Sequence, residues 1–232
     1  MLSEAEQNKL KQEAANQAAK QLVSGMTLGV GTGSTVKYFI DALTRRRDED
    51  GLSLAAIVTT SNRSKEALQA KGFKVSGLSD VELLDLTVDG ADRVDRHLDG
   101  IKGGGGALTM EKNVATYSRH CTWIVDESKV VDHLSGFPLP VEVLRNTCEH
   151  LYRKFADENL EPEFRKDADG RRFMTHYGNY IIDLHVDPIP VPAGLALWLD
   201  TTVGVVEHGL FLNVADKVII AHEDGHIETR TR

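Results

Sequence analysis

The sequence predicts an α/β fold: a doubly wound, Rossmann-like, mostly parallel sheet with a second, smaller α+β subdomain. Between residue 26 and about residue 130, apolar strand-like segments alternate with helical segments, a pattern typical of a parallel sheet with helices on both faces. Polar, glycine-bearing segments follow several of these strands. After about residue 133 the alternation stops and proline-containing segments of mixed period begin, which predicts the second subdomain.

The composition is ordinary for a globular chain. Of its 232 residues, 41% are hydrophobic and 27% are charged, values that exclude a disordered protein. The net charge of -8 argues against a nucleic-acid partner. Two isolated cysteines, Cys121 and Cys148, make neither a disulfide framework nor a CxxC metal site. No apolar signal segment or membrane-spanning run is present, so we expect a cytoplasmic protein with no membrane partner.

The first predicted element is a helix over residues 3–24. Ser3 and Glu6 form a capping-box pattern at its start. Apolar residues recur at every fourth position from Leu10 to Leu22, which places one apolar stripe along the helix. Gly25 is expected to end it.

The next elements alternate between strand and helix. In order, we predict a strand at 26–30, a helix at 34–43, a loop at 45–51, a strand at 54–60, a helix ending at Gly72, a strand at 73–78, a strand within 83–92, a helix at 107–120 and a strand at 121–129. The loop at 45–51 is predicted because the basic run Arg45–Arg47 is followed at once by an acidic run, a pattern typical of a solvated segment.

The remaining segments complete two domains. Within residues 133–208, a β-like stretch at 176–187 precedes an amphipathic helix that starts near residue 191. The segment after residue 208 supplies a strand that returns to the first sheet, and a tail. We therefore predict a Rossmann-like catalytic domain of residues 1–132 plus 209–232, and a smaller α+β subdomain of residues 133–208.

Three polar, glycine-bearing segments are candidates for a ligand site: GVGTGST (29–35), VDGAD (88–92) and IKGGGGA (101–107). We expect all three at the carboxyl ends of strands, where open parallel sheets bind ligands. The first and third lead into predicted helices, whose N-termini favour anions such as phosphate. The first lacks a dinucleotide fingerprint, because Ser34 and Val36 stand where glycine would be required. It also lacks the Gly-Lys-Ser/Thr ending of a P-loop.

Four charged residues beside these loops suit proton transfer next to a carbonyl. Such chemistry needs a base and a stabiliser for the enediolate. Glu111 can supply the base, Lys102 the stabilising cation, and Asp89 and Asp92 the carboxyl groups for hydroxyl protons. Each alone has a structural explanation, since Asp-Gly marks turns and a helical Glu is usually solvated. The set requires no metal and no redox cofactor.

The chain resembles the ribose-5-phosphate isomerase family of the A type. The motifs GTGST, TTSNRS, DGAD, KGGGGAL with EK behind it, IVDESK and PLPVEV follow one another from about residue 29 to 143, and GNYIIDL at 178–184 also fits. The resemblance implies a metal-free interconversion of ribose 5-phosphate and ribulose 5-phosphate in the pentose phosphate pathway. It implies a small sugar phosphate as the partner, no cofactor, and a homodimer or homotetramer formed through the smaller subdomain.

The resemblance also implies roles for individual residues. Glu111 is the base that moves a proton between the first and second carbons, and Lys102 neutralises the enediolate. Asp89 serves hydroxyl proton transfer, and Asp92 helps to open the furanose ring. The implied substrate-binding residues are Thr32, Gly33, Ser34, Thr35, Asp89, Gly90, Ala91, Asp92, Lys102, Gly103, Gly104, Gly105 and Lys129.

Two positions depart from the family pattern. Arg93 follows DGAD where many relatives carry an acidic residue, and Arg145-Asn146 follow PLPVEVL where a proline is common. Neither position is among the implied catalytic residues. The segment HEDGH (222–226) matches the zinc-protease pattern H-E-x-x-H, but its internal Asp224-Gly225 turn signal predicts a hairpin without metal.

Two other functions fit the loops. A sugar-phosphate-binding regulator would keep the phosphate loops, lose the base and need a DNA-binding module. No basic helix-turn-helix segment precedes the predicted sheet here. Another enzyme of the same fold group, such as a sugar-phosphate deaminase or a coenzyme A transferase, would accept a different substrate.

Overall fold

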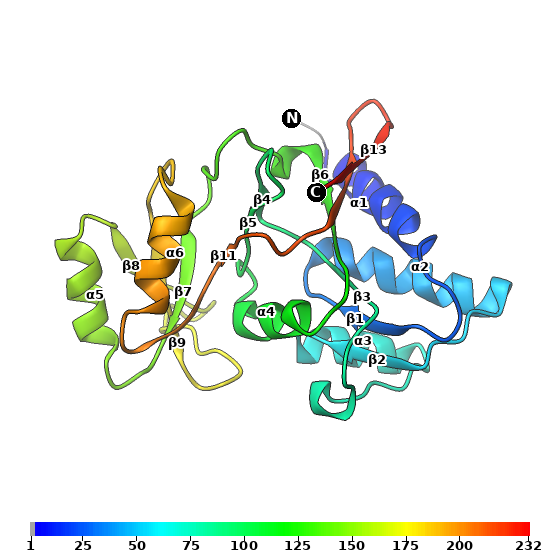
Figure 1. Cartoon of the computed structure of the whole chain (residues 1–232), viewed down its shortest axis with the longest axis horizontal. Helices are drawn as coiled ribbons and strands as arrows, with labels where there is room; N and C mark the ends of the chain where they lie inside the picture. The colour runs from blue at the N-terminus through cyan, green and yellow to red at the C-terminus, as the bar shows by residue number, and fades with distance from the viewer. Residues whose placement is uncertain (1–2) are drawn as a thin grey trace. The chain divides into compact units, whose positions relative to one another are not determined.

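The computed structural model describes residues 3–232, which form two compact units (Figure 1). The first unit comprises the chain up to Ala91, Met110–Val130 and Asn213–Arg232; the second comprises Asp92–Thr109 and Val131–Leu212. The sequence-based division assigned residues 92–109 to the first domain. In the structure this segment belongs to the second unit, because its two short strands pair with each other and with a strand near residue 210.

A six-stranded sheet forms the centre of the first unit, in the order β13-β12-β6-β3-β1-β2. Its strands are β1 (Thr27–Val30), β2 (Ala56–Thr59), β3 (Leu86–Asp89), β6 (Cys121–Asp126), β12 (Lys217–Ala221) and β13 (Ile227–Thr231). All neighbouring pairs are parallel except β12 with β13. The predicted mostly parallel sheet is confirmed. The predicted returning strand is β12, and the predicted tail forms β13.

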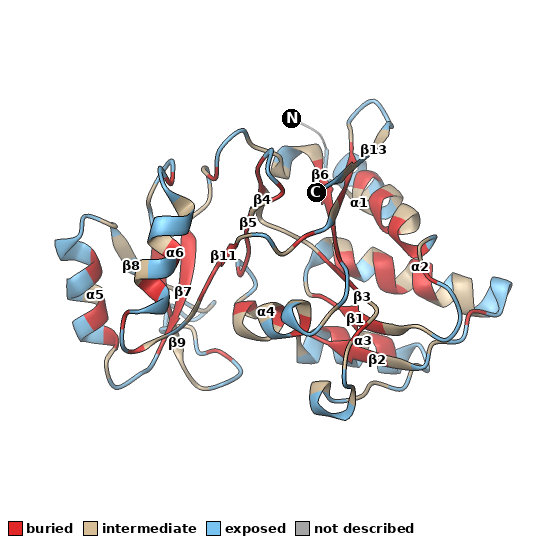
Figure 2. Ribbon diagram, viewed as in Figure 1, coloured by how far each residue is buried: buried red, intermediate tan, exposed pale blue. Residues whose placement is uncertain are grey.

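Helices cover both faces of this sheet. They are α1 (Glu4–Ala19), α2 (Ser34–Asp50), α3 (Asn62–Ala70) and α4 (Leu108–Thr116), with short 3-10 turns at η1 (Leu78–Asp80) and η2 (Glu127–Lys129). On one face, α1 and α2 join strand residues such as Leu28 and Val88 in a large apolar cluster. The other face carries Val58, Leu84 and Val114, the last from α4. Figure 2 shows this burial on the strands and on the inner sides of the helices.

The predicted first helix is confirmed at its start and is shorter at its end. Ser3 and Glu6 make the reciprocal capping-box hydrogen bonds, and the apolar stripe from Leu10 to Leu22 is buried. The helix ends at Ala19 rather than near residue 24, and a turn follows.

The structure contradicts the predictions for two other segments. Residues 45–50 are not a loop but the last turns of α2, which ends at Gly51 in the left-handed conformation (φ 70°). The Arg46 guanidinium donates to the carbonyl oxygens of Ala19 and Leu22, at 2.6 and 3.3 Å, so the basic run contacts the end of α1 rather than only solvent. The strand predicted at 73–78 does not form; a single hydrogen bond of 2.8 Å joins the Ser76 N–H to β2.

Two antiparallel sheets and two helices form the second unit. One sheet has the order β10-β7-β9-β8 and the other β11-β5-β4. The elements are β4 (Arg93–Val94), β5 (Gly100–Ile101), β7 (Leu139–Val143), α5 (Cys148–Asp157), β8 (Pro162–Phe164), β9 (Tyr180–Leu184), α6 (Pro192–Asp200), β10 (Val205–His208) and β11 (Leu210–Phe211). Phe155 of α5, Ile182 of β9 and Leu199 of α6 meet in one apolar cluster. The predicted α+β character of this subdomain is confirmed.

No helix within residues 3–232 combines the length and the apolarity that crossing a membrane requires.

The segment HEDGH lies at the turn of the β12–β13 hairpin, as predicted. The His222 N–H donates to the His226 carbonyl at 2.9 Å, and the His226 N–H donates to the Asp224 side chain at 2.8 Å. The His222 ring contacts two carboxylates: Nδ1 lies 2.9 Å from Glu127 Oε2, and Nε2 lies 3.0 Å from Glu228 Oε2. The histidine therefore joins the hairpin to the turn that follows β6.

This arrangement makes the hairpin sensitive to pH. Burial lowers the pKa of His222, but the hydrogen bonds to Glu127 and Glu228 outweigh burial and raise that pKa above its usual value. Arg230, followed by His222, lowers the pKa of Glu228 to about 2. Both charges are therefore present in mildly acidic solution.

We expect His222→Gln to destabilise the protein in a pH-dependent way. The stability that charged His222 contributes is fully present below about pH 6.5, the pKa of an unfolded histidine, and is lost as the pH rises through the raised folded-state pKa. Urea unfolding should show a loss of about 1 kcal/mol near pH 5.5 and a smaller loss near pH 9. His150→Gln, which replaces an exposed histidine of α5, is the control. Equal losses at both pH values would contradict the prediction.

Candidate active site

Two of the three glycine segments meet at the carboxyl ends of β1 and β3. These strands are parallel neighbours, with Val30 opposite Val88. From β1 the chain continues to β2 on one side, whereas β3 and β6 lie on the other. Such a change of direction is the position at which doubly wound sheets bind ligands. The structure therefore brings the first two predicted loops together within the first unit.

Asp89, at the end of β3, is buried against the first loop. Its Oδ1 accepts hydrogen bonds from the Thr32 N–H at 2.9 Å and the Gly90 N–H at 2.7 Å. A Cβ on Gly31 would lie only 1.8 Å from this oxygen. Glycine is required at position 31 because the Asp89 carboxylate occupies the space of a side chain.

Hydroxyl groups from the end of β2 support the same loop. Thr32 Oγ1 lies 2.7 Å from both Thr60 Oγ1 and Ser61 Oγ. Ser64 Oγ donates to the Gly31 carbonyl at 2.6 Å. The sequence prediction of the site did not include these residues, although they lie in the motif TTSNRS. The two parallel neighbours of β1 end in polar side chains: hydroxyls after β2 and a carboxylate on β3. This pattern in the sequence could have identified these residues as part of the site.

The first loop then starts a helix. Gly33 is the N-cap of α2, with φ 125°, a conformation that side chains rarely adopt. Gly33 and Ser34 are exposed. The start of α2 therefore presents backbone N–H groups and the positive end of a helix dipole, a suitable site for a phosphate.

Glu111 lies in the first turn of α4 and is only 5% exposed. It precedes Val114 by three residues, so the two side chains share one helix face. Val114 packs against the sheet: a Cβ on Gly29 would approach its Cγ1 to 2.8 Å. Because α4 connects the parallel strands β3 and β6, its first turn lies at their carboxyl edge. Glu111 thus lies on the sheet-facing side of α4, at the edge that carries Asp89.

Among the described residues, Lys129 does not contact the other predicted site residues. It ends η2 beyond β6 and is partly buried. Within residues 3–232 it makes no hydrogen bond or ion pair with another predicted site residue.

The third glycine segment does not follow a strand of the parallel sheet, which corrects the sequence-based expectation. It follows β5 in the second unit. Lys102 precedes it and is only 3% exposed. The Lys102 N–H donates to the Gly209 carbonyl at 2.9 Å, and its ammonium lies 5.4 Å from the centre of the Phe211 ring. That distance is within the range of a cation–π interaction, so the Phe211 ring contacts the ammonium while the hydrogen bond to Gly209 holds the backbone.

Residues Gly103–Gly106, here called the glycine loop, contact Asp92. The Gly104 N–H donates to Asp92 Oδ2 at 2.8 Å, so two predicted site residues meet in the second unit. Gly103 has φ 107°, and a Cβ there would lie 2.9 Å from Leu108. A Cβ on Gly106 would lie 2.5 Å from the Phe173 ring. Neighbouring side chains fill the space on these two glycines.

Arg93, one departure from the family pattern, has a structural role. Its guanidinium donates to the Ser135 and Gly136 carbonyls at 3.2 and 2.5 Å. It therefore fixes the segment before β7 to the chain beside Asp92.

A buried carboxylate joins two motifs that carry no predicted site residue. Glu142, in PLPVEV, is 1% exposed. It accepts hydrogen bonds from Thr109, the second residue of α4, at 2.5 Å, from Thr175 at 2.7 Å and from Asn179, in GNYIIDL, at 2.9 Å. Three donors compensate for the burial of this charge. Sequence reasoning did not single out Glu142, because a Glu in an alternating strand is indistinguishable from a solvated one.

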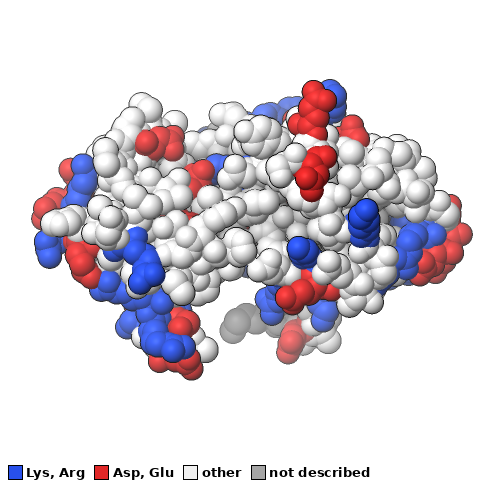
Figure 3. All heavy atoms as spheres, turned by 90° about the horizontal axis from the view of Figure 1, so that it is seen from below, with Lys and Arg blue, Asp and Glu red and all other residues white. Residues whose placement is uncertain are grey.

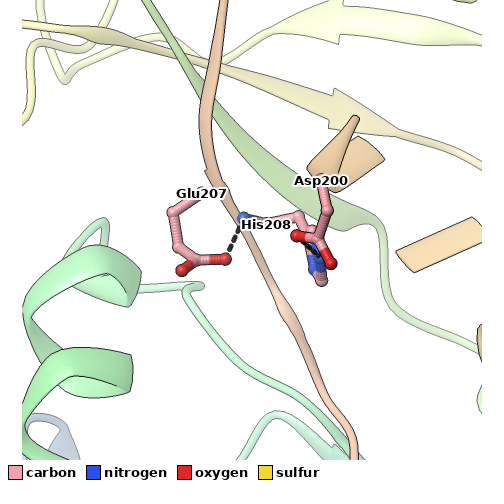
Figure 4. A group of neighbouring side chains, drawn as sticks. All are labelled: Asp200, Glu207 and His208. Carbon is pink, nitrogen blue, oxygen red and sulfur yellow. Dashed lines mark hydrogen bonds and ion pairs between the residues drawn. The ribbon is translucent and has the colours of Figure 1, made fainter. Parts of the chain in front are cut away.

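One cluster in the second unit has the composition of a metal site: Asp200, Glu207 and His208 (Figure 4). Its hydrogen bonds explain it without a metal. His208 Nδ1 accepts from the Leu210 N–H at 3.2 Å, so Nε2 carries the proton that faces Asp200 Oδ1 at 3.1 Å. Glu207 Oε1 accepts from the His208 backbone N–H at 2.7 Å. We regard the cluster as structural.

Comparisons with known proteins identify the family of the chain. Residues 56–225 match the family model of ribose 5-phosphate isomerase A (phosphoriboisomerase A). The ribose-5-phosphate isomerase A of Lactobacillus helveticus is 63% identical over 231 residues, which cover 100% of both chains.

Solved structures give the same result. The ribose 5-phosphate isomerase A of Neisseria gonorrhoeae is 36% identical, with a TM-score of 0.89 and 97% of each chain covered. A D-ribose-5-phosphate isomerase in complex with phospho-erythronic acid is 34% identical, with a TM-score of 0.92, and the match covers 97% of this chain and 98% of that one. By sequence and by fold, the chain belongs to the ribose 5-phosphate isomerase A family.

Proposed function

We propose that this chain interconverts D-ribose 5-phosphate and D-ribulose 5-phosphate through an enediolate, without a metal, and with Glu111 as the base. Family membership supports the reaction. The observation that carries the mechanism is the buried carboxylate of Glu111 in the first turn of α4, on the helix face whose Val114 packs against β1. A carboxylate in a position shielded from water is suited to removing a proton next to a carbonyl.

In the proposed reaction, Glu111 removes the proton from the second carbon of the open-chain aldose and returns it to the first carbon. Negative charge develops on the carbonyl oxygen during this step. Lys102 supplies the neutralising cation: its backbone is held by the Gly209 carbonyl, and its ammonium lies over the Phe211 ring. A fixed cation stabilises a developing oxyanion more than a mobile one, since no reorganisation is required.

The two aspartates have separate proposed roles. Asp89 serves proton transfer between the hydroxyl oxygens. Its Oδ1 accepts two backbone hydrogen bonds, which hold the carboxylate at the end of β3, beside the first loop. Asp92 helps to open the furanose ring, and its contact with the Gly104 N–H sets its orientation.

The phosphate and the sugar hydroxyls are proposed to bind the loops. The hydroxyls of Thr32, Ser34 and Thr35 and the N-terminus of α2 suit an anion. Lys129 is proposed to reach the phosphate or a hydroxyl from the end of η2. The solved relative described above is in complex with phospho-erythronic acid, a sugar acid phosphate. This supports a binding site for the same class of ligand in the present chain.

A regulator that binds a sugar phosphate and DNA is less well supported. It would need a basic surface, whereas basic and acidic side chains lie next to each other on the face shown in Figure 3. The ion pairs of the described residues include Arg47 with Asp48 and Arg172 with Glu149, at 2.7 and 2.6 Å. Such a mixed surface does not favour binding to the phosphate backbone of DNA.

The first test is turnover after metal removal. We expect the purified chain to convert ribose 5-phosphate to ketose at the same rate before and after dialysis against excess EDTA, because the proposed step uses only side chains. Ketose formation is followed directly. Loss of the activity on dialysis and its return with a divalent cation would contradict the metal-free mechanism. A folded chain with no turnover in either sample would contradict the proposed function.

Glu111→Gln should lower kcat by about 10²–10⁴-fold, the usual contribution of a positioned general base. The amide keeps the shape of the side chain and cannot accept the proton. Circular dichroism and the unfolding midpoint show whether the fold is retained. Glu66→Gln on the exposed side of α3 is the control and should retain wild-type kcat. Wild-type turnover in the Glu111→Gln variant would exclude Glu111 as the base.

Gly31→Ala should lower kcat/KM by about 10–100-fold, because a methyl group 1.8 Å from Asp89 Oδ1 must displace that carboxylate. The matched control is Gly194→Ala in α6, where the added Cβ meets only the exposed Val191 side chain at 3.2 Å. Steady-state kinetics of both variants decide the point. Normal kinetics in Gly31→Ala would show that the position of Asp89 is not critical.

A further inference from the structure

Arg165 connects the four-stranded sheet of the second unit to the glycine loop. It directly follows β8, and Asp183 of the neighbouring β9 holds its guanidinium. Nε lies 2.9 Å from Asp183 Oδ2 and Nη2 lies 2.5 Å from Oδ1. The two side chains are each 13% exposed. This is the bidentate geometry in which a guanidinium and a carboxylate fix each other most firmly.

The other edge of the guanidinium faces the glycine loop. Nη1 donates to the Gly103 carbonyl at 2.7 Å and to the Gly104 carbonyl at 3.1 Å. A single arginine therefore fixes two consecutive peptide groups. None of its contacts to the loop depends on a loop side chain.

The first of these peptide groups is held on both sides. In a trans peptide the carbonyl and the N–H point in opposite directions, and the only cis bond in residues 3–232 precedes Pro188. The carbonyl of Gly103 and the N–H of Gly104 belong to the same peptide. The carbonyl accepts from Arg165, and the N–H donates to Asp92 at 2.8 Å. A cation and an anion thus fix the plane of this peptide.

The second peptide group determines where the Gly105 N–H points. Because the Gly104 carbonyl faces Arg165, the Gly105 N–H of the same peptide is directed away from the guanidinium. Gly104 and Gly105 are both exposed. This N–H therefore belongs to a solvent-exposed part of the loop.

The loop needs an external constraint of this kind. Glycine has more backbone freedom than any other residue, and an unconstrained glycine loop would sample many directions for its N–H groups. One internal hydrogen bond, from the Gly106 N–H to the Gly103 carbonyl at 2.9 Å, closes the turn and does not define its orientation. The Arg165–Asp183 pair supplies the missing reference.

We propose that Arg165, held by Asp183, is a positioning residue for the reaction: it orients the glycine loop so that the Gly105 N–H donates to an oxygen of the sugar phosphate, and it fixes Asp92 through the Gly104 peptide. This inference rests on the proposed isomerase function. It gives a role to β9, whose motif GNYIIDL contains Asp183 and no residue that acts on the substrate.

The test compares Arg165→Ala and Arg165→Lys with Arg171→Ala. Arg171 is the matched control, because it is an exposed arginine of the same segment that also pairs with carboxylates. We expect kcat for ribose 5-phosphate to fall about 10–100-fold in Arg165→Ala. Arg165→Lys should recover little of it, because an ammonium cannot bridge Asp183 and two carbonyls at once. Arg171→Ala should keep wild-type kcat.

Three further experiments separate positioning from a general loss of stability. Amide hydrogen exchange without substrate should be at least tenfold faster at Gly104 and Gly106 in Arg165→Ala, with the amides of β7 and β9 unchanged. Methylguanidinium should raise kcat of Arg165→Ala severalfold and leave the wild type unaffected. Asp183→Asn, which keeps the shape of the partner, should give an intermediate kcat.

The outcomes are distinct. Faster exchange at the loop with lower kcat and rescue by methylguanidinium supports the proposal. Unchanged amide exchange in Arg165→Ala, or faster exchange with unchanged kcat, overturns the proposal. If the wild-type chain still turns over ribose 5-phosphate, the proposed isomerase function is unaffected by that result. A wild-type chain without turnover on ribose 5-phosphate would instead overturn the proposed function, and this role of Arg165 with it.

Discussion

The parallel pairing of β1 with β3 is the constraint on which the rest of the first unit depends. It places two glycines of β1 and its loop beside side chains of β3 and α4 that leave no room for a Cβ. At Gly29 a Cβ would lie 2.0 Å from Thr87 Oγ1, and at Gly31 it would lie 1.8 Å from Asp89 Oδ1. The first glycine lets α4 pack closely on the sheet, and the second lets a carboxylate enter the loop.

In the second unit, two buried carboxylates connect segments of the chain through hydrogen bonds. Glu142 and Asp183 are 1% and 9% exposed, and burying a carboxylate is unfavourable unless donors satisfy it. Each has them: two hydroxyls and an amide for Glu142, and a guanidinium for Asp183. The two strands that carry these residues are neighbours in one sheet. Through these hydrogen bonds they connect segments that lie far apart in the chain.

The proposed site residues belong partly to one unit and partly to the other. It passes from the first to the second between Ala91 and Asp92, within the motif DGAD, and returns between Thr109 and Met110, just before Glu111. Asp89 and Glu111 thus belong to the unit with the parallel sheet, and Asp92 and Lys102 to the other. The short segment between the two crossings contains the glycine loop, so each crossing lies within a few residues of a proposed site residue.

The sequence by itself determined the class of the first sheet, the motifs and the residue types of the site. Alternating strands and helices, the capping box at Ser3, and glycines before helices are local signals, because neighbouring residues produce them. The Arg45–Arg47 run and the 73–78 segment were predicted wrongly because charge and apolarity do not show which partner a segment meets; Arg46 contacts the end of α1. Only the tertiary structure decided that the glycine loop belongs to the second unit and that Thr60, Glu142 and Arg165 hydrogen-bond to Thr32, Thr109 and Gly103. Their partners lie 28 to 62 residues away in the chain, and hydrogen bonds over such separations exist only once the sheets have formed.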